Sequence, residues 1–301
     1  MRADLLHAAF GARPDAAVRV PVDAAPLDRW LAAVVLGGQG RYAAAAALLT
    51  GLLGARDPVV AALAGTTLAA HLRQVGGHAE ARGYDAEAAR RLAGAPGEPG
   101  PAHPHGVDRA GATADVLLGL AADAVGLGRT GETTRLLAAA RRVGGTPSWR
   151  TTVRIGWVAA ELALATDRPD TAVSHAEESK RFAEGAGATR HTVKSTMMLA
   201  VALATGGTPD GRRRAERLLT DAVAVSLTRG MFSLTWPCAL QLAELAPDQA
   251  AQHRAVAVDA LTRVFSWSDP TKRRIAAASP WLPATLIHSG EPTRSGCGGI
   301  T

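Results

Sequence analysis

Apolar residues recur every three to four positions along most of the chain, and short groups of Gly, Pro and Asp interrupt this pattern at regular distances. Such a spacing places apolar side chains on one face of an α-helix. The helical stretches come in pairs, as where 27–36 and 41–53 are joined across Gly37–Gly40. The sequence therefore predicts a succession of antiparallel helical hairpins.

Six such hairpins can be delimited. They span 27–53, 59–92, 112–143, 149–185, 190–227 and 231–265, and a short helix over 271–278 follows the last one. Corresponding turns are 37 to 41 residues apart once the Pro/Gly-rich segment 94–106, which widens one interval, is left out. A fixed period of this length is typical of a helical solenoid. The predicted fold class is all-α, a right-handed superhelix of about six antiparallel helical hairpins.

The same pattern divides the chain into segments. We predict an N-terminal arm over 1–25, two hairpins over 26–93, a flexible linker over 94–106, four further hairpins with a capping helix over 107–288, and a disordered tail over 289–301. Pro and Gly exclude a helix in the linker. The sequence leaves open whether this linker separates two halves of the stack.

Composition supports helices that pack closely. Apolar residues make up 47% of the chain, mostly Ala and Leu, and aromatic residues only 4%. Ala and Leu favour helices, whereas sheets favour β-branched and aromatic residues. The chain has two cysteines, Cys238 and Cys297, and we predict no disulfide between them. Without a continuous apolar stretch at the N-terminus or a run long enough for a membrane helix, the sequence favours a cytoplasmic location.

Two turns carry the signature of a known repeat. Gly40-Arg41-Tyr42 followed by Ala45, and Leu72–Ala81 followed by Tyr84, resemble the turn between the two helices of a tetratricopeptide repeat. The resemblance extends over most of 26–266, although the period exceeds the 34 residues of that family and its signature Trp and Pro are not regularly placed. The chain thus resembles extended, degenerate bacterial members. The resemblance implies a concave groove, lined by the first helix of each hairpin, that binds a protein or peptide.

Basic residues recur at the period of the hairpins. Arg109, Arg150, Arg190 and Arg229 are 41, 40 and 39 residues apart, and Arg154 and Lys194 lie one helical turn after two of them. Equivalent positions of packed helices lie about 10 Å apart, so these residues predict a basic stripe. The resemblance implies that Arg150, Arg154, Arg190 and Lys194 grip carboxylates of a peptide, with Arg229 at the flank and Trp157 as an aromatic anchor. Alternatively, these side chains stabilise the carbonyl ends of preceding helices.

The sequence offers little for catalysis. The segment Gly126–Gly131 matches G-x-G-x-x-G, but a predicted helix precedes it where a nucleotide-binding fold needs a strand, and Glu132 stands where a phosphate loop has Lys. We find no H-E-x-x-H, C-x-x-C or G-x-S-x-G motif. We therefore expect no metal, no cofactor and no catalytic residue.

The leading hypothesis is a non-catalytic, regulatory scaffold that recognises an acidic or C-terminal peptide segment of a partner. A nucleic-acid-binding helical repeat is the alternative, because the net charge is +6, the isoelectric point is about 10.1, and basic runs occur at Arg212–Arg214 and Lys272–Arg274. An all-helical enzyme is a third hypothesis that no motif supports.

Overall fold

The structure is a computed structural model that describes residues 1–95, 101–144, 147–279 and 282, and these residues form helices and no strand. The prediction of an all-α fold is confirmed. The helices are α1 (Arg2–Phe10), α2 (Pro26–Gly38), α3 (Tyr42–Thr50), α4 (Pro58–Arg73), α5 (His78–Ala93), α6 (Arg109–Gly126), α7 (Thr130–Arg141), α8 (Trp149–Ala165), α9 (Pro169–Gly185), α10 (Thr189–Thr205), α11 (Pro209–Thr228), α12 (Phe232–Leu245), the 3-10 turn η1 (Pro247–Gln249), α13 (Ala250–Ser266) and α14 (Pro270–Ala278).

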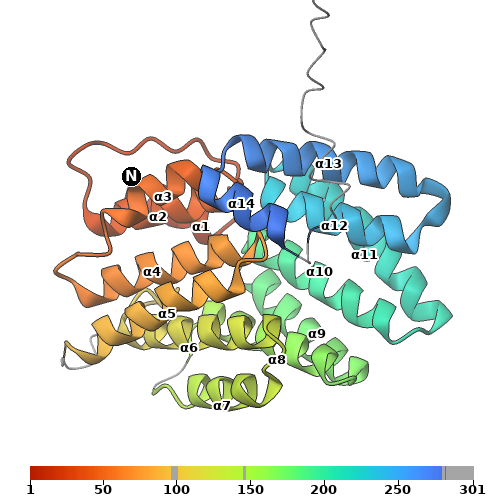
Figure 1. The fold of residues 1–301 in the computed structure, drawn as a ribbon, viewed down its shortest axis with the longest axis horizontal. Helices are drawn as coiled ribbons and strands as arrows, with labels where there is room; N and C mark the ends of the chain where they lie inside the picture. The colour runs from red at the N-terminus through yellow and green to blue at the C-terminus, as the bar shows by residue number, and fades with distance from the viewer. Residues whose placement is uncertain (96–100, 145–146, 280–281, 283–301) are drawn as a thin grey trace, which may run out of the picture.

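Six consecutive hairpins, α2–α3 to α12–α13, follow one another around a ring (Figure 1). The first helix of each hairpin packs on the first helix of the next and forms the inner layer, whereas the second helices lie outside. Helix α4 packs directly on α6, so the stack continues across the Pro/Gly-rich segment between them.

Several helices begin at a proline or a capping side chain. Pro occupies the first turn of α2, α4, α9, α11 and α14, where its missing N–H costs no hydrogen bond. Helix α6 starts at Arg109, three residues before the predicted Ala112, because the Asp108 carboxylate accepts a hydrogen bond from the Gly111 N–H at 2.8 Å. Local chemistry thus fixes where the inner helices α2, α4, α6 and α8 begin.

The last hairpin closes the ring by packing against the first. The Ser233 hydroxyl donates to the Gly38 carbonyl at 2.6 Å, and the Ala43 N–H donates to the Trp267 carbonyl at 2.8 Å. At this seam Gly40 has a φ of +84°, and a Cβ there would lie 2.7 Å from a methyl group of Val264. Only glycine meets both requirements.

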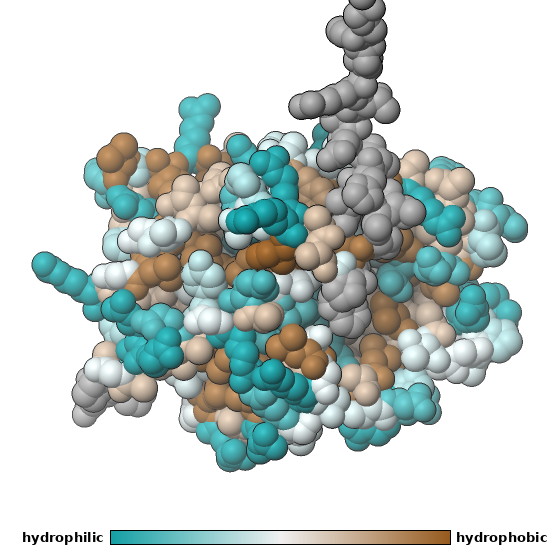
Figure 2. Space-filling model, in the orientation of Figure 1, coloured by the Kyte–Doolittle hydropathy of each residue, from teal (hydrophilic) through white to brown (hydrophobic). Residues whose placement is uncertain are grey.

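Two segments cover the ends of the ring. The predicted N-terminal arm packs against the inner helices through α1, whose Phe10 is buried. At the other end, Ile275 of α14 reaches the turn at Gly77, and Lys272 of the same helix is buried. The predicted tail 289–301 lies outside the described residues, as does part of the predicted linker. Within the described ranges, no helix has both the length and the apolar character needed to cross a membrane. On the face in Figure 2, apolar side chains form small groups among hydrophilic ones.

Candidate functional site

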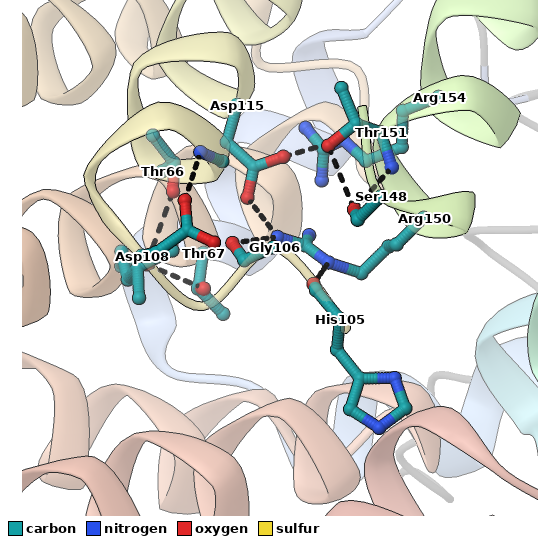
Figure 3. A network of polar contacts seen from close by, with 12 residues as sticks. Thr66, Thr67, His105, Gly106, Asp108, Asp115, Ser148, Arg150, Thr151 and Arg154 are labelled. Atoms are coloured by element: carbon teal, nitrogen blue, oxygen red, sulfur yellow. Dashed lines mark hydrogen bonds and ion pairs between the residues drawn. The ribbon is translucent and has the colours of Figure 1, made fainter. Parts of the chain in front are cut away.

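Arg150, at the start of α8, is turned into the protein. Its guanidinium donates to the Asp115 carboxylate of α6 at 2.7 Å and to the carbonyls of His105 and Gly106 at 2.7 and 3.2 Å (Figure 3). Only 3% of the residue is exposed. A buried charge needs such complete pairing. Arg150 therefore has structural partners within the protein. These are a carboxylate and the segment before α6, whereas the alternative stated from the sequence was the carbonyl end of a preceding helix.

Arg154 lies one turn further along α8, on the same side. Its Nε is 3.2 Å from the second carboxylate oxygen of Asp115, so one carboxylate serves two guanidinium groups (Figure 3). Its side chain keeps 22% of its surface exposed, in contrast to the 4% of the Arg150 side chain. Because this carboxylate is shared with Arg150, it balances the positive charge of Arg154 only in part.

Arg190 and Lys194, on the adjacent inner helix α10, make no hydrogen bond or ion pair with any residue that the structure describes. The Arg190 side chain crosses the ring toward Gly38, where a Cβ would come within 3.0 Å of its Cδ. Its Nε is buried without a partner. The Lys194 Nζ lies 4.4 Å from the centre of the Trp157 indole, close enough for a cation–π interaction.

Trp157 organises the inner surface between α8 and α10. Its indole N–H donates to the Ser195 hydroxyl at 2.8 Å, and its rings stack on His191 at 5.5 Å. Burial and neighbouring arginines hold the pKa of His191 well below its ordinary value, so this imidazole is neutral. Trp157 is 7% exposed and acts from within the wall.

Arg229 lies at the edge of the ring, away from the other basic residues of the predicted stripe. Its Nη1 is 3.4 Å from the Asp15 carboxylate of the N-terminal arm. The structure thus brings Arg150, Arg154, Arg190 and Lys194 together on two adjacent helices and separates Arg229 from them.

A second polar cluster was not predicted. The Arg73 guanidinium, at the end of α4, lies 2.6 Å from Asp85 and 3.1 Å from Asp123, both of which are fully buried. Burial, together with the neighbouring Asp123, raises the pKa of Asp85 to about 7 against the attraction of Arg73. The signal was present in the sequence, since Asp85, Asp115 and Asp123 all fall on helix faces that are otherwise apolar.

The remaining candidates for chemistry have structural surroundings. The Gly126–Gly131 segment ends α6 and begins α7, so a helix precedes it, and Glu132 pairs with Arg82. Burial raises the pKa of the Cys238 thiol to about 12, which keeps it protonated and unreactive. Among the described residues, no three metal-ligating side chains lie close enough to hold an ion. In the two basic runs, Arg213, Arg214 and Lys272 pair with acids.

A cavity of about 1010 Å³ lies between the third and fourth hairpins, on the side of α7 and α9. Mostly small residues line it, together with six charged or titratable residues: His103, Asp108, Arg109, Arg141, His175 and Glu178. Arg109 of the predicted stripe lines this cavity, whereas the four basic residues on α8 and α10 do not. The cationic interior is therefore a separate feature.

Comparison with solved structures finds a protein of similar fold. A Rap protein, solved in complex with competence and sporulation factor, is similar to 83% of this chain over 67% of its own length, with a TM-score of 0.59 and 10% sequence identity. A likeness at this identity concerns the fold. No family model and no curated protein matches the sequence.

Proposed function

We propose that this chain is a non-catalytic regulatory scaffold that binds an acidic or C-terminal segment of a protein or peptide on the inner surface and rim of the ring. Its contacts are Arg154, Arg190, Lys194, Arg229 and Trp157, and Arg150 positions the wall behind them. The similar Rap protein was solved with a bound factor, and this supports a binding role for the architecture.

The N-terminal arm already lies on the rim in the manner of a bound peptide. After α1 the chain runs without secondary structure, and its carbonyls accept hydrogen bonds from the ring. The Thr189 N–H donates to Gly11 at 3.2 Å, and the Gln39 amide donates to Pro14 and Ala16 at 2.9 and 3.0 Å. The acceptors in these bonds are backbone carbonyls, so a peptide of another sequence could accept the same hydrogen bonds.

One contact of this arm carries the proposal. Asp15, an acidic side chain of the extended segment, faces Arg229, one of the basic residues singled out by their spacing. An exposed ion pair of this kind contributes at most about 1 kcal/mol, which suits a contact that a partner displaces. The arm and a partner segment then compete for the same rim.

The proposal is tested with a labelled peptide of residues 8–18 added to the full chain. In a Phe10→Ala variant, whose resident arm is held less tightly, we expect fluorescence anisotropy to show tighter binding of the added peptide. Adding Arg229→Glu should remove this gain, because it opposes the peptide carboxylate.

Arg213→Glu is the matched control, because Arg213 is exposed on α11 and pairs only with the local Asp210. It should leave peptide binding unchanged. Circular dichroism verifies that each variant keeps its helicity. Absence of peptide binding in both the native chain and the Phe10→Ala variant, or binding indifferent to Arg229, would overturn the proposal.

A further inference from the structure

The interior of the ring contains more positive charge than its acidic residues balance. We propose that Arg154, Arg190 and Lys194 form a binding site for an oxyanion, a carboxylate or a phosphate group. This inference deepens the proposed function, since the anionic group of a bound segment is one source of such a ligand. A free small anion is the other.

The three cations come from two helices that pack side by side. Arg154 lies on α8, and Arg190 and Lys194 lie one turn apart on α10. In addition to burial, the charge of Arg154 lowers the pKa of both Arg190 and Lys194, and the charge of Arg190 lowers the pKa of Lys194. Like charges in a confined space repel, and this repulsion favours a bound anion.

The acids near these cations leave Arg190 and Lys194 without an ion pair. Asp115 is shared between Arg150 and Arg154, and both of its oxygens are engaged. Glu161 attracts Lys194 but forms no ion pair with it among the described residues. The side chains of the two cations on α10 therefore form no ion pair within the described protein.

Arg190 is the clearest case, because a guanidinium stays charged at every pH a protein meets. Its Nε is buried and unpartnered, and so is the hydroxyl of Tyr42, the nearby group that favours its charge. Tyr42 stacks on His71 at 5.0 Å, and the Nδ1 of His71 is also unpartnered. Buried polar groups without partners are costly, and a ligand with several acceptor oxygens can satisfy them.

The donors favour an oxyanion over other ligands. Guanidinium and ammonium groups only donate, and a guanidinium fork matches two oxygens of a carboxylate or phosphate. The Trp157 indole holds the Lys194 ammonium over its face, so this charge has a defined place beside the fork.

The test uses the full chain and isothermal titration calorimetry at constant ionic strength, with inorganic phosphate in one arm and succinate in the other. We expect saturable binding in at least one arm, and the arm that binds identifies the oxyanion. Arg190→Gln and Lys194→Gln should each weaken binding about tenfold to a hundredfold, as expected for a lost hydrogen bond to a charged group.

Arg213→Gln on the outer helix α11 is the control and should bind as the native chain does. Circular dichroism checks folding, and Lys194→Gln retains the test if Arg190→Gln fails to fold. No binding in either arm, or equal affinity in Lys194→Gln and the native chain, overturns the site. If the anion binds and the 8–18 peptide does not, the proposed scaffold function is refuted and the anion site stands. If the peptide binds and neither anion does, the anion site is refuted and the scaffold function stands.

Proton uptake provides a second readout. Burial, together with repulsion from Arg154, Arg190 and Arg73, lowers the pKa of Lys194 to about 8 against the attraction of Glu161. A bound anion raises that pKa, so binding near pH 8 takes up protons, and the measured heat depends on the ionisation enthalpy of the buffer. Affinity should fall as the pH rises through 8. Lys194→Gln should abolish both effects.

Discussion

At the scale of single residues, one buried carboxylate, that of Asp115, pairs with two arginines of the interior. Asp115 accepts a hydrogen bond from Arg150 and forms an ion pair with Arg154, and so it joins α6 to α8. An arginine that loses its only carboxylate inside a protein cannot neutralise itself by releasing a proton. The wall of the ring therefore depends on this one side chain.

Replacing Asp115 by Ala should destabilise the protein by about 3–5 kcal/mol, because Arg150 is left as an uncompensated buried charge. Urea denaturation followed by circular dichroism measures the loss. Asp259→Ala is the control, since that carboxylate forms only an exposed ion pair with Arg263 on α13. An equal effect of the two substitutions would contradict the role of Asp115.

Lys194 should give the stability of the fold a distinct pH dependence. Its pKa is about 8 in the folded chain, below the ordinary 10.5, so the unfolded chain binds more protons between these values. Stability therefore rises with pH from about 8 to 10.5, by up to about 1.4 kcal/mol for each pH unit. Thermal melts of the native chain and of Lys194→Met across this pH range measure the effect. The difference in stability between the two chains at each pH is the contribution of Lys194. A difference independent of pH would exclude it.

At the scale of elements, the six hairpins could be predicted because their signals are local: apolar spacing inside a helix, and Gly, Pro or Asp at its ends. The residues on neighbouring helices, such as Arg150 and Arg154 near Arg190 and Lys194, followed from the period alone. Asp115, the partner of Arg150 and Arg154, could not be identified from the period, because it is 35 residues from Arg150 and on another hairpin. Spacing indicates which face a side chain occupies, whereas its partner depends on the packing of a different hairpin.

The turn between α2 and α3 shows how one element serves the whole ring. Gly40→Ala should cost about 1–3 kcal/mol, because Ala is strained at a positive φ and its Cβ meets Val264 of the last hairpin. Gly54→Ala, at a position with open space and an ordinary φ, should have little effect. Denaturation midpoints compare the two. Adding Val264→Ala to Gly40→Ala should recover only the steric part of the loss.

At the scale of the whole molecule, the contact between the first and last hairpins distinguishes this ring from an open solenoid. It was invisible to sequence analysis, since the groups that bond across it, such as Ser233 and Gly38, are 195 residues apart. Tyr42 of the first hairpin shares a buried cluster with Trp236 and Leu261 of the last one. In an open solenoid each repeat depends only on its neighbours.

Leu261→Ala should therefore be felt at both ends of the chain. The cavity should cost about 2–5 kcal/mol, and hydrogen exchange should show faster amide exchange in α3 as well as in α13. Leu137→Ala is the control, because Leu137 is a comparably buried leucine of the third hairpin. It should speed amide exchange in α3 only as far as it lowers the stability of the whole protein. Unchanged protection in α3 after Leu261→Ala would show that the seam contributes nothing to the first hairpin.

Closure also bears on how such a chain can change in evolution. An open solenoid tolerates the gain or loss of a repeat, because the new end resembles the old one. Here a seventh hairpin would push Val264 away from Gly40, and a missing one would leave Tyr42 without its cover. The number of hairpins is therefore fixed by geometry.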